Sequence, residues 1–288
     1  MNNKEDILKQ KVFIIFILIN LFLIACFQNE KDPVGNASSQ RKSEEEERQE
    51  RIATIKKNGI PSEVIEVLKE HNNENWSADI NHPGYFRAIS VVFDKVPYKV
   101  VGGTEFSYND TKSSDRAKES KAARREVYLA LNYFFGSIRA FGEFIEKLVE
   151  TRDLVTKNKA ALKDFFKKMR DCAKAYYVDA YDTLQKKLGN LEVLSAAEVK
   201  SLHDNLALLK AEREKLVSKI LQPLKDKYPI IGECLADPGS KKIVNTLTAD
   251  EIETYWNTLS AEFNSICDEI MRISGEIKGI LDNIKVKG

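Results

Sequence analysis

The stretch that decides the fold is residues 248–281, TADEIETYWNTLSAEFNSICDEIMRISGEIKGIL. Its apolar side chains recur every three or four residues, which is the spacing of one face of an α-helix. Thr248 and Glu251 fit a capping box, so the helix is expected to begin there. We predict one long amphipathic helix whose buried face is formed by Ile252, Trp256, Leu259, Phe263, Ile266, Ile270, Ile273, Ile277 and Leu281.

Three earlier segments repeat this pattern, at residues 115–151, 153–188 and 195 to about 228. A C-cap signal, Gly189-Asn190, ends the second segment, and Pro223 is expected to kink the third or to end its regular part. Shorter helical patterns precede them at residues 52–58, at 62 to about 72 and at 83–93. The sequence therefore predicts an all-α protein, an antiparallel helical bundle of four long helices with two or three short N-terminal helices.

Two features qualify this pattern. Gly136 and Gly142 lie inside the first long segment, where each costs roughly 0.5–1 kcal/mol relative to alanine, and we interpret them as positions of a close helix crossing or a bend.

Residues 94–114 contain the β-branched and aromatic run Val96–Val101, which suits a strand, but Pro97 argues against a central strand. We predict an extended, partly apolar loop there, with Gly102-Gly103 as a plain turn.

The N-terminus carries a different kind of signal. Three lysines lie in a polar start, thirteen residues from Val12 to Ile24 are apolar except Asn20, and Leu23-Ile24-Ala25-Cys26 follows. A run of this length before a small residue describes a secretory signal and is too short for a spanning helix. The cysteine after the small residue makes this a lipobox, in which Cys26 receives lipid and the chain is cut before it. An ordinary secretory signal whose cleavage site contains a cysteine is the alternative.

These signals divide the chain into three parts. Residues 1–25 are predicted to be a lipoprotein signal peptide, residues 26–51 the lipidated cysteine with a disordered tether, and residues 52–288 the helical domain. Because two or more acyl chains make membrane anchoring lasting, the membrane is one expected partner, reached through lipid.

The charge balance argues against nucleic acid as a partner. Removing residues 1–25 takes away three lysines and two acidic residues, so 45 basic and 44 acidic residues fall to 42 of each. Proteins that bind nucleic acid carry a clear basic excess in the binding domain, and this chain carries none.

Three cysteines remain on the exported side of the membrane, where disulfides persist: Cys172, Cys234 and Cys267. Three thiols can form any one of three disulfides, and the remaining thiol always stays unpaired. We favour Cys234–Cys267, because a cysteine in a loop can adjust to meet one on a helix. The alternative is three small buried apolar residues without any disulfide.

The sequence contains no signature of catalysis. His71, His82 and His203 lie far apart and lack the partners of a zinc site, and no phosphate-binding loop or nucleophile elbow occurs. We therefore predict no enzyme, no cofactor and no metal.

Two features could serve recognition instead. Tyr98, Phe106 and Tyr108 lie in the predicted loop, and we expect them to form an exposed aromatic patch that binds a partner. The second is a basic cluster within two helical turns, but glutamates are interleaved with it, so we expect a salt-bridged, solvated face. Its residues are Lys118, Lys121, Arg124 and Arg125.

The leader with Cys26, the charged tether and the Lys/Glu-rich helical body together resemble the outer-surface lipoproteins of Borrelia spirochaetes. These include plasmid-encoded helical surface antigens, among them types that acquire complement regulators. The resemblance implies an outer-membrane, lipid-anchored location at the cell surface and a host protein as partner, such as a complement regulator, plasminogen or a matrix protein. It carries over no binding residue.

We therefore expect a surface-exposed bacterial lipoprotein, a non-catalytic antigen that binds a host protein and serves immune evasion. One alternative is a periplasm-facing lipoprotein with a structural or assembly role, since the leader does not encode the leaflet. A hydrolase or a small-ligand carrier is the weaker alternative, and it requires an enclosed cavity with convergent polar groups.

Overall fold

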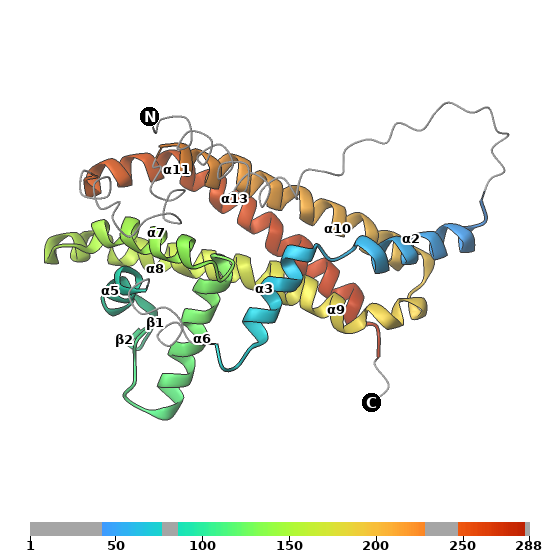
Figure 1. Cartoon of the computed structure of the whole chain (residues 1–288), viewed down its shortest axis with the longest axis horizontal. Helices are drawn as coiled ribbons and strands as arrows, with labels where there is room; N and C mark the ends of the chain where they lie inside the picture. The colour runs from blue at the N-terminus through green and yellow to red at the C-terminus, as the bar shows by residue number, and fades with distance from the viewer. Residues whose placement is uncertain (1–41, 77–85, 228–246, 286–288) are drawn as a thin grey trace, which may run out of the picture. The chain divides into compact units, whose positions relative to one another are not determined.

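The computed structural model describes residues 42–76, 86–227 and 247–285. The chain divides into two units, Met1–Lys42 and Ser43–Gly288, of which the second contains nearly all described residues. This second unit is mostly helical, and its described part contains one two-stranded sheet (Figure 1). The predicted all-α class is confirmed. The leader, Cys26, His82 and Cys234 lie outside the described residues.

The first described helix, α2 (Glu44–Asn58), begins before Ile52, within the stretch predicted as a disordered tether. Ser43 explains the early start, because its Oγ accepts from the Glu46 amide at 3.3 Å while the Glu46 carboxylate accepts from the Ser43 amide at 2.8 Å. The run Glu44–Glu47 fills the first turn, where negative charge stabilises the positive end of the helix dipole. The acidic run therefore starts a helix. Helix α3 (Ser62–Asn72) follows, with the bounds expected from the sequence.

Three long helical segments carry the core. The first is α8 (Arg152–Lys174), which continues through a π-helical segment, η2 (Ala175–Asp182), and α9 (Thr183–Lys187) into the 3-10 segment η3 (Leu188–Val193). The second is α10 (Ala196–Leu216), a π-helical segment η4 (Val217–Leu221) and α11 (Gln222–Lys227), and the third is α13 (Ala249–Asp282). The capping boxes predicted at Ser195 and Thr248 are both present. A π-helical segment interrupts the regular α-helix just before Pro223, and α-helix resumes in α11 and continues through this proline.

Contacts between their ends fix the directions of these three segments. Lys157 pairs with Asp250 at 3.3 Å near the start of α13, and Lys187 donates to the Leu281 carbonyl at 3.1 Å near its end, so α8–α9 and α13 run the same way. Asn283 donates to Glu198 at 2.9 Å, which places the end of α13 beside the start of α10. The segment α10–α11 therefore runs in the opposite direction.

The fourth predicted long helix is divided. Instead of one helix over residues 115–151, the chain forms α6 (Ser114–Ala130), α7 (Phe135–Glu146) and a 3-10 turn, η1 (Lys147–Val149). Asn132 and Tyr133 separate α6 from α7 with φ of 58° and 55°, a left-handed conformation that no α-helix continues through. The prediction of one helix here is wrong, and the bundle of four long helices is not confirmed.

Helix α7 instead crosses α5 (Arg87–Lys95), which begins later than the predicted start at Pro83. A Cβ built on Gly142 would lie 2.6 Å from the Ile89 amide nitrogen. Only glycine allows two backbones to approach this closely. The close crossing predicted for Gly142 is confirmed.

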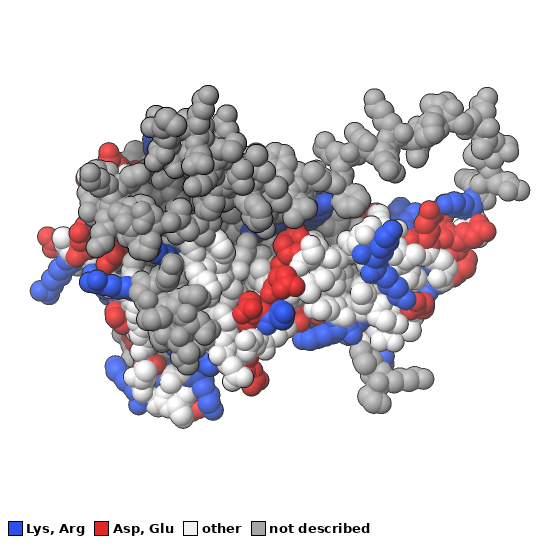
Figure 2. Space-filling model, in the orientation of Figure 1, with Lys and Arg blue, Asp and Glu red and all other residues white. Residues whose placement is uncertain are grey.

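Two more properties of the described residues bear on possible partners: the apolar length of the helices and the distribution of charge on the surface. In the part of the chain that the structure describes, no helix combines the length and apolar character needed to cross a membrane. On the face seen in Figure 2, basic and acidic side chains are interspersed. This face carries no extended field of one sign that would attract a polyanion.

Candidate functional site

The most distinctive local structure is a β-hairpin formed by β1 (Pro97–Val101) and β2 (Thr104–Ser107), which we call the hairpin. The strands are antiparallel, with Val101 opposite Thr104 across a two-residue turn. Gly102 and Gly103 have φ of 56° and 80°, and positive φ at both turn residues is what a tight hairpin turn requires. The extended loop predicted over residues 94–114 is thus corrected, and the turn predicted at the two glycines is confirmed. Pro97 is tolerated because it is the first residue of an edge strand.

The hairpin changes the exposure expected for the three aromatic residues. Tyr98 is only 8% exposed and Tyr108 is fully buried, so the prediction that they form an exposed patch is wrong for both. Phe106 is half-buried and packs against the edge of the core. The exposed apolar residues of the hairpin are Val100 and Val101, which are 45% and 58% exposed. A β-branched pair beside two glycines was the sequence signal for this exposed tip.

Tyr108 anchors the hairpin to the helices beneath it. Its ring stacks on Phe93 of α5, with centroids 4.6 Å apart. Its hydroxyl accepts from Arg170 of α8 at 3.1 Å, and Arg170 also pairs with Glu126 of α6 at 2.9 Å. Burial raises the pKa of Tyr108, so the phenol stays protonated at physiological pH. One side chain therefore ties together three helices.

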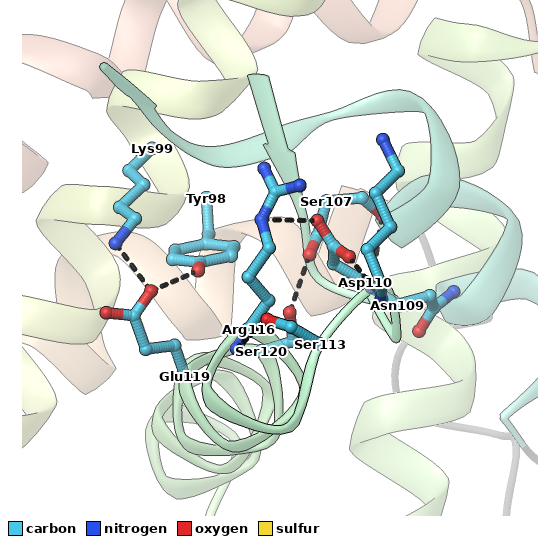
Figure 3. A network of polar contacts seen from close by, with 10 residues as sticks. Tyr98, Lys99, Ser107, Asn109, Asp110, Ser113, Arg116, Glu119 and Ser120 are labelled. Carbon is cyan, nitrogen blue, oxygen red and sulfur yellow. Dashed lines mark hydrogen bonds and ion pairs between the residues drawn. The ribbon is translucent and has the colours of Figure 1, made fainter. Parts of the chain in front are cut away.

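Tyr98 and Lys99 meet Glu119 of α6 on the other side of the hairpin (Figure 3). The Glu119 carboxylate accepts from the Tyr98 hydroxyl at 2.9 Å and from Lys99 Nζ at 2.5 Å. Burial and then the Glu119 charge raise the pKa of Tyr98 to about 12, while hydrogen bonds from Lys99 and Tyr98 lower the pKa of Glu119. The phenol remains a donor and the carboxylate an acceptor across the physiological range.

Phe106 lies between two cations. Lys99 Nζ is 4.6 Å and Arg116 Cζ is 4.1 Å from the centre of its ring, which is the geometry of a cation–π contact. Arg116 is oriented by Asp110, whose buried carboxylate lies 3.3 Å from Arg116 Nε. The half-exposed edge of the hairpin is thus an aromatic ring held between positive charges.

Polar contacts fix the base of the hairpin to α5 and α6, and Figure 3 shows the contact with Ser120 of α6. The Ser120 hydroxyl donates to the Ser107 carbonyl at 2.9 Å, and the Ser107 hydroxyl donates to the Phe93 carbonyl at 2.9 Å. Asn109 Nδ2 donates to Asp94 at 2.8 Å. Because the base is fixed, the apolar tip is presented in one orientation.

The predicted basic cluster acts differently from the solvated face that we expected. Arg125 donates to the carbonyl of Asn73 at 2.8 Å and also to that of His71, and Arg124 donates to the Tyr108 carbonyl. Lys121 Nζ lies 3.4 Å from the Glu74 carbonyl. Arg125 and Lys121 attach the end of α3 and the residues after it to α6, and Arg124 attaches Tyr108 to α6, so the role of these three side chains is structural.

His71 completes this attachment and makes it sensitive to pH. Tyr133 donates its hydroxyl to the Arg125 carbonyl at 3.1 Å, so the imidazole donates its Nδ1 proton to Tyr133 at 2.9 Å. Burial and then the Arg125 charge hold the pKa of His71 below its ordinary value of 6.5. A histidine with a lowered pKa in the folded state favours folding while it is neutral. Its contribution is complete above the unfolded pKa and is lost as the pH falls from that value through the lowered pKa of the folded state.

We therefore expect His71→Asn, which keeps a donor near the position of Nδ1, to flatten the loss of stability below about pH 6.5. Urea unfolding of the wild type and the variant at several pH values between pH 5 and 8 measures this. The exposed His203 supplies the matched control, His203→Asn. Curves for His71→Asn and the wild type that stay parallel over this range would contradict the prediction.

The side chains of the hairpin suit the binding of a partner. Within residues 42–76, 86–227 and 247–285, no group of three or more His, Cys, Asp or Glu side chains is placed to hold a metal ion. The hairpin presents an apolar tip on a fixed base, and its nearby charges pair within the chain, as Lys159 does with Glu105 at 2.6 Å. Such a surface can bind a protein partner by apolar contact.

The described residues form a helical body that carries one β-hairpin. Residues 87–282 match the family model described as Borrelia Bbcrasp-1 domain containing protein, and the chain belongs to this family of plasmid-encoded Borrelia surface lipoproteins. The match begins at the first residue of α5 and ends at the last residue of α13. The resemblance predicted from the sequence is confirmed. Searches of curated proteins and of solved structures found no match to this chain.

Proposed function

We propose that this protein is held in the outer membrane through lipid on Cys26 and that its helical body binds a host protein through the hairpin. Membership of a surface lipoprotein family supports the location, and the lipobox around Cys26 supports the anchor. The observation that carries the binding site is the exposure of Val100 and Val101, at 45% and 58%, on a hairpin whose base is fixed.

The proposed contact follows from the charges around the hairpin. Lys99 and Glu119 pair with each other, as do Lys159 and Glu105, so neither pair requires a charge from the partner. A partner with an apolar depression would bury the two valines and exclude water from the Gly-Gly turn. Complement regulators, plasminogen and matrix proteins are the partner classes that we propose.

The test uses residues 43–288, which form one compact unit with its own core. The immobilised protein is exposed to serum and to matrix extract, and bound proteins are identified by mass spectrometry. We expect a host protein to be retained at micromolar concentration. Recovery of none from either source would overturn the proposed binding function.

The hairpin is tested on the recovered partner with a double variant, Val100→Glu and Val101→Glu. We expect at least about tenfold weaker binding, because a charge at the centre of an apolar contact must be desolvated. Val193→Glu is the matched control, since Val193 is also exposed, at 66%, but lies in η3. Equal binding by the double variant and the control would show that the binding site does not include the hairpin.

The location is tested separately. Treating intact cells with protease removes a surface protein and spares one that faces the periplasm, which would favour the structural or assembly role. Labelled palmitate should appear in the wild type and be absent from Cys26→Ser. A small-ligand carrier would need a larger cavity than the one that the described residues Met169, Tyr176 and Arg213 help to line, which measures about 40 Å³. Sites for small molecules usually measure about 300–1,000 Å³.

A further inference from the structure

Two cysteines that are 95 positions apart in the sequence meet in the core. Cys172 of α8 and Cys267 of α13 are both free thiols, buried where these helices pack together. The predicted partner of Cys267, Cys234, lies outside the described residues, whereas Cys172 lines the same cavity as Cys267.

The two thiols line the same small cavity as one cationic side chain. The cavity measures about 40 Å³, and its lining is otherwise mostly apolar and aromatic. The exception is Arg213 of α10, whose guanidinium carbon lies 5.5 Å from the centre of the Tyr176 ring. The cavity therefore combines a thiol pair with a positive charge, which is the environment that stabilises a thiolate.

This environment makes the two thiols unequal. The neighbouring Cys267 thiol and then the charge of Arg213 lower the pKa of Cys172, while the neighbouring Cys172 thiol and burial raise the pKa of Cys267. Exposure points the same way, because Cys172 is 5% exposed and Cys267 is fully buried. Cys172 is therefore the more reactive of the two thiols and the one less covered by the protein.

The backbone beside Cys172 is also unusual. The π-helical segment η2 begins three residues after Cys172, and its consecutive residues Tyr176 and Tyr177 both line the cavity. Segments of π-helix are rare and frequently occur at functional sites. Here the π-helical segment turns two neighbouring side chains toward the thiols.

We propose that Cys172 and Cys267 are a redox-active thiol pair, which a small-molecule disulfide oxidises to a disulfide that joins α8 to α13. The Cys172 thiolate attacks the small disulfide, whose S–S bond breaks and releases one thiolate, leaving a mixed disulfide on Cys172. Cys267 then gives its proton to the released thiolate and attacks the Cys172 sulfur, which displaces the second small thiolate. This thiolate takes from water the proton that Cys172 gave up when it ionised. In total, two protein thiols and one small disulfide become one protein disulfide and two small thiols.

The inference stands apart from the proposed binding function, since neither cysteine belongs to the hairpin. The disulfide would close a loop of about 95 residues that includes α10 and α11, and a loop of this size restricts the unfolded chain strongly. We expect oxidation to raise the Tm by on the order of 10 °C.

Residues 43–288 with Cys234→Ser retain only this thiol pair. Incubation with glutathione disulfide under native conditions should remove both free thiols, and peptide mapping should find Cys172 joined to Cys267. In the wild type the same pairing is expected, with Cys234 left over. Two free thiols remaining in Cys234→Ser, or a wild-type disulfide that involves Cys234, would overturn the proposal, as would a fall in Tm on oxidation.

Two more single variants test the order of attack. Cys267→Ser should accumulate glutathione on Cys172, because the thiol that resolves the mixed disulfide is missing, whereas Cys172→Ser should leave Cys267 unmodified. Circular dichroism before oxidation establishes that both variants are folded. Modification of Cys267 in Cys172→Ser at the rate of Cys172 in Cys267→Ser would contradict the proposed order.

Discussion

Replacing Tyr108 by alanine is expected to lower the free energy of unfolding by about 3–5 kcal/mol. The side chain is fully buried, stacks on Phe93 with ring centroids 4.6 Å apart and lies 5.9 Å from the ring of Phe166. Truncation would leave a cavity between α5, α8 and the hairpin that these rings cannot fill without moving their helices. Domains are stable by only about 5–15 kcal/mol, so this one substitution would remove a large share of the total.

Tyr108→Phe separates the packing of the ring from its hydrogen bond. The ring remains, and only the contact from Arg170 at 3.1 Å is lost, so we expect a loss of about 1–2 kcal/mol. Urea unfolding followed by circular dichroism measures both variants, with Val101→Ala at the exposed tip as a control expected to change stability by less than about 0.5 kcal/mol. A loss in Tyr108→Ala no larger than that in Tyr108→Phe would mean that the ring is not packed as described.

The same substitutions bear on the proposed function. If the hairpin binds the host protein, Tyr108→Phe should keep the tip in place and bind as the wild type does. Tyr108→Ala should weaken binding, because the hairpin loses the side chain that joins it to α5 and α8. Of these two variants, only Tyr108→Ala damages the base of the hairpin. We therefore expect it alone to lower both the free energy of unfolding by several kcal/mol and the affinity for the host protein.

The sequence predicts helices well where their ends carry local chemistry. The capping boxes at Ser195 and Thr248, the glycine after α2 and the start of α3 at Ser62 are all read from neighbouring residues, and the structure confirms them. Ser43 and Glu46 form the same kind of box, but the glutamate run that it starts has the composition of a solvated tether, which hides the helix start.

The break between α6 and α7 could not be predicted in this way. Leu131, Phe134 and Phe135 keep the helical spacing across it, and Tyr133 is a residue that seldom adopts positive φ. The conformation is held by contacts from distant segments. Tyr177 donates to Asn132 at 2.7 Å, and His71 contacts the Tyr133 hydroxyl at 2.9 Å. The residues next to the break do not indicate which distant side chains will contact Asn132 and Tyr133.

The candidate sites show the same limit. The composition of Val96–Val101 suits a strand, but Pro97 leads to the prediction of a loop, and which ring is buried depends on where α5 and α8 lie beneath the hairpin. That Cys172 and Cys267 line one cavity likewise depends on how α8 and α13 pack together. The adaptability of a loop cysteine favours Cys234 as the partner of Cys267, whereas packing places Cys172 on the same cavity as Cys267.

The crossing of α5 and α7 supplies the second large effect, and we expect Gly142→Ala to destabilise the protein by about 2–3 kcal/mol. The added Cβ would lie 2.6 Å from the Ile89 nitrogen and 3.0 Å from its Cα. Both are backbone atoms, so no side chain can rotate away, and the two helices must separate. Separation would expose Ile89 and Ile138, which are fully buried.

Gly279→Ala is the matched control, and we expect the opposite sign. Gly279 is an exposed residue of α13, and no atom lies within 4 Å of a Cβ built there. Alanine restricts the unfolded chain and favours the helix, so the variant should gain about 0.5–1 kcal/mol. Urea unfolding of both variants decides the matter. If Gly142→Ala also gained stability, α7 would not cross α5 at this glycine, and the hairpin, whose Ser107 is hydrogen-bonded to Phe93 of α5, would lose its fixed base.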